Sequence, residues 1–285
     1  MEGCMNILKH MKKFLFYFIS IVLLSSGCEK KPYVIVQIAD SQLGFTAMVQ
    51  NEGSSAEYVN DLTYESECLK KAVAYVNKIM PDVIVFTGDQ VNISDNQEQW
   101  ETFAAIISEI SEGIKVLHVP GNHDLQIGDA HVDMSQFSSR YGEGRFVHSD
   151  SGVNIVGMNT NLIKYDDPVE CEQMDWLKTV LSRTTRDEVT LVFGHHPFFE
   201  TDIDEEDTYS QITQCKRRMY FDVFKEHGVD AVYAGHCHES HSGEYNGIPM
   251  KTTTSVAYQL GTSASSVRVI TVKDGQLSDE LVEII

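Results

Sequence analysis

The sequence has few basic residues and few prolines. Of its 285 residues, 22 are Lys or Arg and 42 are Asp or Glu, which gives a formal net charge of -20. Proteins bind nucleic-acid backbones through clustered Lys and Arg, so this balance excludes nucleic acid as a partner. With only 6 prolines and neither repeats nor low-complexity tracts, the chain is not fibrous or disordered. A globular protein with a large core remains.

Long hydrophobic runs are also scarce. Lys12 and Lys13 precede an apolar run of 11 residues from Phe14 to Leu24, interrupted by one Ser. This run is too short to span a bilayer, and a basic segment followed by a short apolar one is typical of a secretory signal. We therefore expect an exported chain that is periplasmic or lies on the cell surface.

The end of the apolar run resembles a bacterial lipobox. It reads Leu-Ser-Ser-Gly-Cys over residues 24–28, although Ser25 stands where such sites usually carry Leu. We predict a lipoprotein signal peptide over residues 1–27 and a tether over 28–32, with a lipid anchor on Cys28 as the membrane attachment. An ordinary signal peptide with an unrelated Cys is the alternative.

Cysteine is sparse in the predicted mature domain. In an exported protein its four cysteines could form two disulfides, but their spacing does not assign the pairs. A domain of this size can also be stable with free buried cysteines, so both alternatives remain open. The four are Cys68, Cys171, Cys215 and Cys237.

The chain alternates short apolar runs with helical patterns, which predicts an α/β fold with parallel strands in a single domain over residues 33–285. Residues 46–61 are polar and small and predict a surface loop. The predicted strands are 33–39, 82–86, 114–119, 145–148, 153–158, 188–193, 229–234, 249–254, 266–272 and the last residues after the Asp274-Gly275 turn. The predicted helices are 65–80, 96–111, 172–181 and 216–227.

Five of the predicted strands end in side chains that can bind a metal. One such turn is ordinary, because Asn, Asp and Gly are the commonest turn residues. Five in chain order are hard to attribute to turn chemistry, and ligands of open α/β sheets bind at these strand ends. Mixed carboxylate, imidazole and amide ligands suit Mn, Fe or Zn better than Ca, and suit a pair of metals. The residues are Asp40, Asp89, Asn122, His195, and His236 with His238.

These motifs resemble those of the calcineurin-like metallophosphoesterases. The shared order is Asp-x-x, Gly-Asp-x-x-Asn, Gly-Asn-His-Asp, Gly-His and Gly-His-x-His, from residue 33 to about residue 260. The match is closer to the branch of Ser/Thr protein phosphatases with a calcineurin-like phosphoesterase domain. That branch is similar over residues 39–44, in the acidic run 203–209 and in Gln-Leu-Gly at 259–261. The resemblance implies a four-layer αββα sandwich with two mixed β-sheets.

The resemblance also implies a role for each motif residue. Asp89 would bridge two divalent metals, Mn, Fe or Zn. His123 would be the general acid, with Asp124 or a backbone group orienting it. The first metal would bind Asp40, His238 and Gln42, and the second Asn122, His195 and His236.

Two positions depart from the wider superfamily. Most members have His where this chain has Gln42. An amide oxygen is a weaker ligand than an imidazole, so we expect one of the two metals to be loosely held or of a different kind. The suspected branch resembles this chain in having Gln there. The phosphoprotein phosphatases have an Asp, paired with the catalytic His, where this chain has Asn92.

The function implied is metal-dependent hydrolysis of phosphomonoesters, with a bridging hydroxide as nucleophile. The expected partner is a phosphoester substrate, either a small molecule or a phosphoprotein, and the chain is expected to be a monomer. The alternatives are a phosphodiesterase or nucleotidase at the same site, and a non-catalytic metal-stabilised binding lipoprotein. Candidate phosphate clamps are Arg140, Arg145, Lys216, Arg217 and Arg218.

Overall fold

The computed structural model describes residues 31–51, 60–128 and 131–284. The predicted signal peptide and Cys28 lie outside the described residues, so both stay predictions. Residues Pro32–Ile285 form one compact unit. Within the described ranges, none of the helices is both long enough and apolar enough to cross a membrane.

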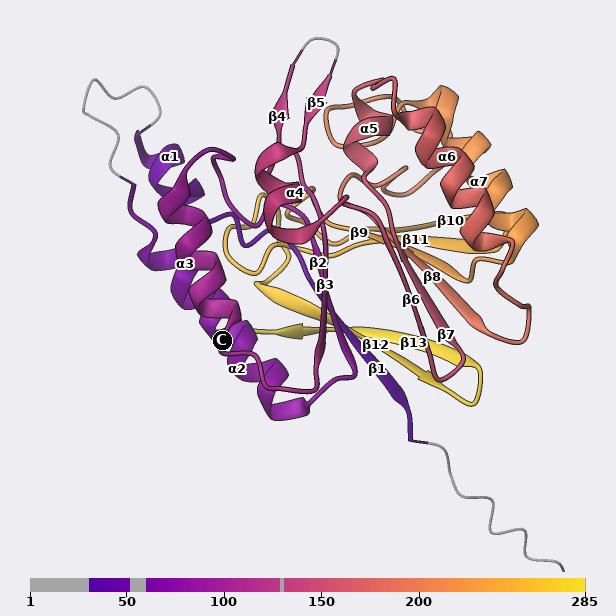
Figure 1. Cartoon of the computed structure of the whole chain (residues 1–285), viewed down its shortest axis with the longest axis horizontal. Coiled ribbons are helices and arrows are strands. Elements are labelled where there is room, and N and C mark those ends of the chain that lie inside the picture. Colours follow the sequence, from indigo (N-terminus) through magenta and orange to yellow (C-terminus); the bar gives the residue numbers. More distant parts are fainter. Residues whose placement is uncertain (1–30, 52–59, 129–130, 285) are drawn as a thin grey trace, which may run out of the picture. The chain divides into compact units, whose positions relative to one another are not determined.

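Two mixed β-sheets form the centre of this unit (Figure 1). The first has the order β13-β12-β1-β2-β3, with β1, β2 and β3 parallel. The second has the order β10-β11-β9-β8-β7-β6, with β11, β9, β8 and β7 parallel. The strands of the first sheet are β1 (Tyr33–Ile38), β2 (Val83–Thr87), β3 (Lys115–Val119), β12 (Ser266–Lys273) and β13 (Gln276–Glu283). Those of the second are β6 (Phe146–Asp150), β7 (Val153–Gly157), β8 (Val189–Phe193), β9 (Ala231–Ala234), β10 (Ser242–Tyr245) and β11 (Ile248–Thr252).

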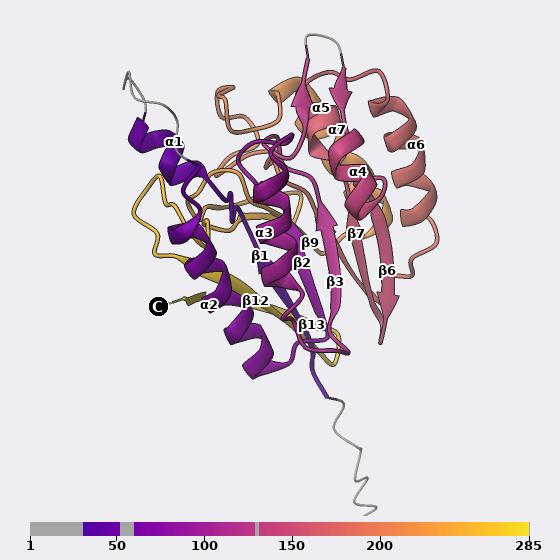
Figure 2. The ribbon, with the colours of Figure 1, turned by 60° about the vertical axis from the view of Figure 1, so that its left-hand side comes forward.

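Helices cover the outer faces of the two sheets (Figures 1 and 2). α2 and α3 pack on the first sheet, while α6 and α7 pack on the second. A small hairpin of β4 and β5 follows β3 in the chain. The bounds are α1 (Phe45–Asn51), α2 (Thr63–Ile79), α3 (Gln97–Ile107), β4 (Gln126–Ile127), β5 (Val132–Asp133), α4 (Ser135–Tyr141), α5 (Thr160–Lys164), α6 (Glu170–Leu181) and α7 (Gln214–His227).

Three apolar clusters define four layers. One joins α2 and α3 to the first sheet, one joins α6 and α7 to the second, and one fills the space between the sheets. Because both faces of each sheet are buried, the central strands read as continuous apolar runs. The predicted αββα class is therefore confirmed. Representative members are Leu69, Phe103 and Ile84; Leu177, Phe221 and Val192; and Ile35, Val85, Ile155 and Leu191.

The layer between the sheets becomes polar near the carboxyl ends of the strands. Gln37 is buried there and donates from Nε2 to the Ala234 carbonyl (2.8 Å) and to the Thr87 hydroxyl (3.0 Å). Its Oε1 accepts from the Thr253 hydroxyl at 2.7 Å. These bonds join the two sheets directly beneath the motif turns.

The structure tests two predictions from the sequence, the loop over residues 46–61 and the pairing of the cysteines. The loop predicted over residues 46–61 is wrong in its first part, because Phe45–Asn51 forms α1. The carboxylate of Glu65 holds this short helix by accepting from the Thr46 amide at 2.6 Å. The four cysteines of the described domain are free thiols, so they form no disulfides with one another.

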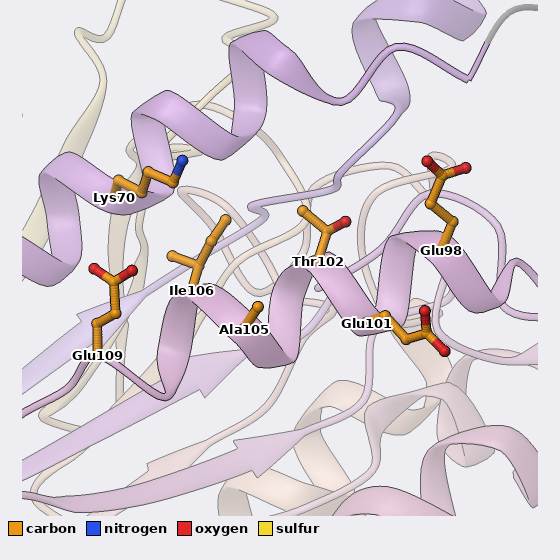
Figure 3. A pocket seen from close by; sticks show the side chains of 7 residues that line it. All are labelled: Lys70, Glu98, Glu101, Thr102, Ala105, Ile106 and Glu109. Carbon is orange, nitrogen blue, oxygen red and sulfur yellow. The ribbon is translucent and has the colours of Figure 1, made fainter.

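A groove between α2 and α3 is separate from the motif turns (Figure 3). Three carboxylates and one ammonium group line it, and neither an imidazole nor a thiol joins them. It therefore lacks the ligand chemistry of the strand ends. The lining residues are Lys70, Glu98, Glu101, Thr102, Ala105, Ile106 and Glu109.

Candidate metal centre

The carboxyl ends of five strands bring six of the seven predicted ligands into mutual contact. His195, which follows β8, lies at the centre of this group. Its Nε2 is 3.1 Å from Asn122 Oδ1, 3.1 Å from His236 Nδ1 and 3.4 Å from Asp89 Oδ2. Its Nδ1 lies 3.9 Å from Asp40 Oδ1, and His238 Nε2 lies 3.7 Å from the same oxygen. These six residues are called the Asp/His cluster below.

Gln42, the seventh predicted ligand, is next to this cluster. Its backbone amide donates to the Asp89 carbonyl at 2.7 Å, and its side-chain Nε2 is 3.4 Å from Asn92 Oδ1. The side-chain Oε1 is buried and has no hydrogen-bond partner among the described residues. Gln42 therefore has an unused acceptor at the edge of the cluster.

Left-handed backbone conformations set the orientation of the predicted ligand side chains. Asp40, Gln42, Asp89, His236 and His238 have φ values of 54°, 39°, 50°, 68° and 50°. Such conformations cost non-glycine residues of order 1–3 kcal/mol each, and they concentrate at functional sites. The surrounding hydrogen bonds hold these turns in place.

Glycine is required where the turns pass close to the carboxylates. A Cβ atom on Gly121 would collide with the carboxylate of Asp89, and one on Gly235 would lie 2.6 Å from Asp40 Oδ2. The glycines of Gly-Asn-His-Asp and Gly-His-x-His thus make room for the neighbouring strand's ligand. This is a steric reason for the repeated Gly in the motifs.

Backbone carbonyls fix the orientation of three histidines. His195 Nδ1 donates to the Thr87 carbonyl (2.9 Å), and His238 Nδ1 donates to the Tyr258 carbonyl. Both rings thereby direct Nε2 into the cluster, since a carbonyl can only accept. His123 Nδ1 donates to the Asn92 carbonyl at 2.9 Å, which leaves its Nε2 free. A backbone group therefore orients His123, as one of the two alternatives predicted.

The cluster favours positive charge at its centre. Burial by itself would lower the pKa of His195, but the carboxylates of Asp89 and Asp40 outweigh burial and raise that pKa to about 9. Burial lowers the pKa of His236 and of His238, so their rings are neutral and keep a lone pair. The carboxylates of Asp89 and Asp40 that stabilise a proton on His195 would also stabilise a metal cation at the same place.

Unpaired buried atoms test whether the cluster fits a metal. Besides Gln42 Oε1, His236 Nε2 is buried and has no hydrogen-bond partner in the described part of the chain. Buried polar atoms are rarely left unpaired, so each needs an explanation. Neutral imidazole nitrogens, carboxylates and amide oxygens with unused lone pairs form a suitable site for a borderline divalent cation.

His196 directly follows His195 in the chain and is not among the predicted ligands. Both of its ring nitrogens are buried without a partner among the described residues, and its ring centroid lies 4.2 Å from that of His236. Donor atoms of His195, His196 and His236 lie within 4.8 Å of one another. The Thr160 hydroxyl accepts from both backbone amides of the His195-His196 pair, at 3.0 and 2.8 Å. The two adjacent histidines at positions 195 and 196 are the feature of the sequence that could have indicated His196.

Asp124 contacts backbone amides. Its Oδ1 accepts from the amides of Gln90 (2.8 Å) and Val91 (3.2 Å), and its Oδ2 accepts from the Gly121 amide (2.8 Å). Burial and the nearby Asp89 raise the pKa of Asp124 to about 8. These bonds tie the turn after β2 to the turn after β3.

Aromatic side chains border the cluster. Tyr209, in the acidic run, places its hydroxyl 3.4 Å from Asn122 Nδ2 and its ring 5.1 Å from the ring of His236. On another element, the ring of Phe45 is 5.5 Å from that of His238 and 5.1 Å from that of Tyr258. In the sequence, Tyr209 stands out only as part of the acidic run 203–209, and no periodic pattern marks its position.

The candidate phosphate clamps are engaged by other protein groups. Among the described residues, each of the five cations has a protein partner outside the Asp/His cluster. The structure therefore singles out none of the five as a phosphate clamp. The pairs are Arg140 with Gln97, Arg145 with Glu143, Lys216 with Glu170, Arg217 with Asp207 and Arg218 with Asp204.

Fold and site together define a phosphoesterase. Residues 33–240 match the calcineurin-like phosphoesterase family, which is well over half of the chain. The chain belongs to this family, and it is a metal-binding hydrolase that acts on phosphoric esters.

Individual relatives refine the comparison. The serine/threonine-protein phosphatase CPPED1 of Bos taurus is 29% identical over 262 residues, which cover 85% of this chain and 81% of that protein. A dimetal phosphatase from Danio rerio has a similar fold, with a TM-score of 0.59 and 15% identity over 90% of this chain and 100% of that chain. A purple acid phosphatase from yellow lupin has a TM-score of 0.67 and 11% identity, over 90% of this chain and 52% of that chain.

Proposed function

We propose that the chain hydrolyses phosphomonoesters, with phosphoproteins among its candidate substrates. The observation that carries the proposal is the convergence of Asp89, Asn122 and His236 on His195 Nε2. This arrangement calls for a cation at the ends of parallel strands. Similarity to CPPED1, whose name describes a serine/threonine-protein phosphatase, favours monoesters over diesters.

The proposed ligands fall into two groups that share Asp89. Asp40, Gln42 and His238 would hold one divalent ion, and Asn122, His195 and His236 would hold the other. Mn, Fe or Zn suits this mixture of donors. Bound ions of this kind act as Lewis acids on phosphoryl oxygens and make water a strong nucleophile near neutral pH.

His123 is the proposed general acid. Its Nδ1 is bonded to the Asn92 carbonyl, and its backbone amide donates to Asp89 Oδ1 at 2.8 Å. The ring is therefore fixed relative to a ligand, while Nε2 is free to give a proton to the leaving oxygen. The alcohol product leaves neutral, and His123 regains its proton from solvent.

Asp124 and Tyr209 have supporting parts in the proposal. Asp124 keeps the turn that carries Asn122 and His123 in register with the turn that carries Asp89, through its three amide bonds. The Tyr209 hydroxyl, beside Asn122, is placed to donate to a phosphoryl oxygen. Aromatic rings on the border would contact the organic part of the substrate.

A metal-reconstitution assay tests the function. The purified chain is stripped with a chelator and reloaded with Mn, Fe, Co or Zn. We expect it to hydrolyse p-nitrophenyl phosphate and to act much more slowly on bis-p-nitrophenyl phosphate. Faster turnover of the diester would favour a phosphodiesterase. No turnover with any metal, although elemental analysis finds metal bound, would favour a binding lipoprotein.

We also infer that the chain is exported and anchored through a lipid on Cys28, and that it acts as a monomer. The apolar run before Cys28 and its lipobox-like sequence support the anchor. Expression in a bacterium with radiolabelled palmitate should label the wild-type chain and leave Cys28→Ala unlabelled. Equal labelling of both chains would contradict the anchor, and light scattering of the released domain would test the monomer.

A further inference from the structure

A second group of metal-binding side chains lies beside the Asp/His cluster. It consists of Glu200, beyond the end of β8, Cys237, between the ligands His236 and His238, and His241, just before β10. All three are partly buried, and one donor atom from each lies within 4.8 Å of the others. They belong to neither of the proposed metal positions.

Two donor separations in this group are close to those of a tetrahedral metal site. Glu200 Oε2 lies 3.5 Å from His241 Nε2, and Glu200 Oε1 lies 3.8 Å from Cys237 Sγ. Metal–ligand bonds of about 2.0–2.3 Å at tetrahedral angles place donor atoms about 3.4–3.6 Å apart. Both separations are within a few tenths of an ångström of that range, and all three donor atoms lie within 4.8 Å of one another, so one ion could contact all three after the side chains adjust.

Neighbouring groups hold the Glu200 side chain and the His241 backbone in place. Gln211 Nε2 donates to Glu200 Oε1 at 2.9 Å, and the Glu200 backbone amide donates to the carboxylate of Glu205 at 2.6 Å. His241 is held at its backbone, where its amide donates to the Thr252 hydroxyl at 2.7 Å and its carbonyl accepts from the Thr252 amide at 3.1 Å. Outer hydrogen bonds of this kind orient the ligands of metal sites.

We propose that Glu200, Cys237 and His241 form a third metal site that takes Zn²⁺ or another thiophilic divalent ion. The site is chemically distinct from the Asp/His cluster, because it supplies a thiolate and the cluster supplies none. Three protein ligands of the types S, N and O leave a fourth position for water. On binding, the metal–sulfur bond replaces the S–H bond of Cys237, and the proton leaves to solvent.

The position of the site suggests what the ion does. It would join the segment after β8, which carries His195, to the turn after β9, which carries His236 and His238. Cys237 is the residue between two proposed ligands, so an ion bound to its sulfur would restrict the turn that aims both imidazoles. The third site would thus stabilise the arrangement of the Asp/His cluster without touching substrate.

Cobalt substitution separates the two kinds of site. The purified full chain is stripped of metal and titrated with Co²⁺ while its ultraviolet and visible spectra are recorded. A thiolate ligand produces an intense charge-transfer band to Co²⁺ in the near ultraviolet, and carboxylates, amides and imidazoles do not. We expect three Co²⁺ ions per chain and a charge-transfer band that saturates with one of them.

Cysteine variants assign the band. Cys237→Ser should lose the charge-transfer band and one equivalent of Co²⁺ while keeping the visible d–d bands of the other two. Cys171→Ser, which changes an exposed free thiol on α6, is the matched control and should keep the band. If circular dichroism shows that Cys237→Ser does not fold, Glu200→Gln and His241→Gln serve instead. Both should weaken, at least tenfold, the Co²⁺ binding that the charge-transfer band reports.

Two results would overturn the third site. One is saturation with Co²⁺ without a charge-transfer band, in which case the group is a Glu–His ion pair beside a buried thiol. The other is a band that persists in Cys237→Ser. The inference is independent of the proposed function, because an inactive chain that shows the band would reject phosphomonoester hydrolysis and leave the third site standing.

Discussion

His123 is the side chain whose replacement should separate chemistry from metal binding. Its Nδ1 donates to the Asn92 carbonyl and its backbone amide donates to Asp89 Oδ1, but its Nε2 is unused. We predict that His123→Asn lowers kcat on p-nitrophenyl phosphate about 100- to 10,000-fold, the usual contribution of a general acid. Metal content by elemental analysis should stay at the wild-type value.

A histidine outside the site provides the control for this variant. His131 has a side chain that is 69% exposed, and His131→Gln should leave both kcat and metal content unchanged. A His123→Asn enzyme with wild-type kcat would remove the proposed acid from the reaction. A loss of metal in the same variant would instead make His123 a ligand.

His118 on β3 should make the fold sensitive to acid. Its ring stacks between Phe86 and Tyr141, at centroid distances of 5.0 and 4.0 Å, and its Nδ1 is buried without a hydrogen-bond partner among the described residues. Burial lowers the pKa of His118 from 6.5 to about 3. The unfolded chain therefore takes up a proton below pH 6.5, whereas the folded chain does so only near pH 3.

This difference fixes the sign of the pH dependence. Between pH 6.5 and 3 the unfolded state binds more protons, so the contribution of His118 destabilises the fold progressively as pH falls through that window. His118→Phe keeps an aromatic ring but cannot titrate. We predict that its free energy of unfolding in urea falls less than the wild-type value between pH 7 and pH 5. Identical losses in the two proteins would contradict the prediction.

At the scale of elements, Arg217 of α7 controls the segment that carries Tyr209. It is fully buried and donates to the carbonyls of Ile212 (2.8 Å), Ile203 (3.2 Å) and Glu205 (2.7 Å), besides its ion pair with Asp207. Arg217→Met fills much of the space but leaves these carbonyls unpaired. We predict a loss of about 3–5 kcal/mol in the free energy of unfolding, typical of breaking a buried charged network.

The adjacent Arg218 is a matched control. It lies on the same helix, pairs with Asp204 of the same segment, and is exposed. Arg218→Met should change stability little, because exposed ion pairs contribute little. Equal losses from the two substitutions, measured by urea unfolding, would mean that the segment is not held by buried hydrogen bonds.

The elements also differ in how far the sequence could predict them. The strands before the motif turns were evident, because burial on both faces gives continuous apolar runs. Three short helices were not predicted, because a helix of one or two turns has too few residues to display a period. They are α1 (Phe45–Asn51), α4 (Ser135–Tyr141) and α5 (Thr160–Lys164). α1 exists through contacts such as the bond from the Thr46 amide to Glu65, which lies 19 residues further on.

The functional site also contains some residues whose positions could be predicted from the sequence and others whose positions could not. Asp89 and Asn122 could be predicted to lie together, because the parallel neighbours β2 and β3 present their carboxyl ends at one edge of the first sheet. His195 follows a strand of the second sheet and joins them through the packing of the two sheets. The Asn92 carbonyl that orients His123, and the amides that occupy Asp124, could not be predicted, because backbone groups carry no sequence signal. Tyr209 comes from an irregular segment whose path depends on the buried Arg217.

At the scale of the whole molecule, the proposed ligands come from both sheets. Asp40, Asp89 and Asn122 follow strands of the first sheet, whereas His195 and His236 follow strands of the second. Bound ions would therefore crosslink the two sheets. We predict that loading Mn²⁺ or Zn²⁺ raises Tm, because a ligand at 100 times its Kd stabilises the native state by about 2.7 kcal/mol.

Calorimetry of the stripped and reloaded chain checks this prediction. Asp89→Asn removes the shared ligand, and its Tm should respond much less to added metal. Glu101→Gln, on α3, changes a carboxylate that lines the groove and is not part of the cluster, so this variant should respond like the wild type. A wild-type Tm that is independent of metal would contradict a crosslink between the sheets.

The left-handed turns at Asp40, Gln42, Asp89, His236 and His238 have a consequence for laboratory evolution. Glycine adopts these conformations without strain, so a change such as Gln42→Gly should relieve strain at that turn while it removes a proposed ligand. Selecting this chain for heat resistance alone would therefore favour substitutions that remove proposed metal ligands. Thermal screens of Gln42 libraries should recover variants with a higher Tm in metal-free buffer and lower phosphatase activity.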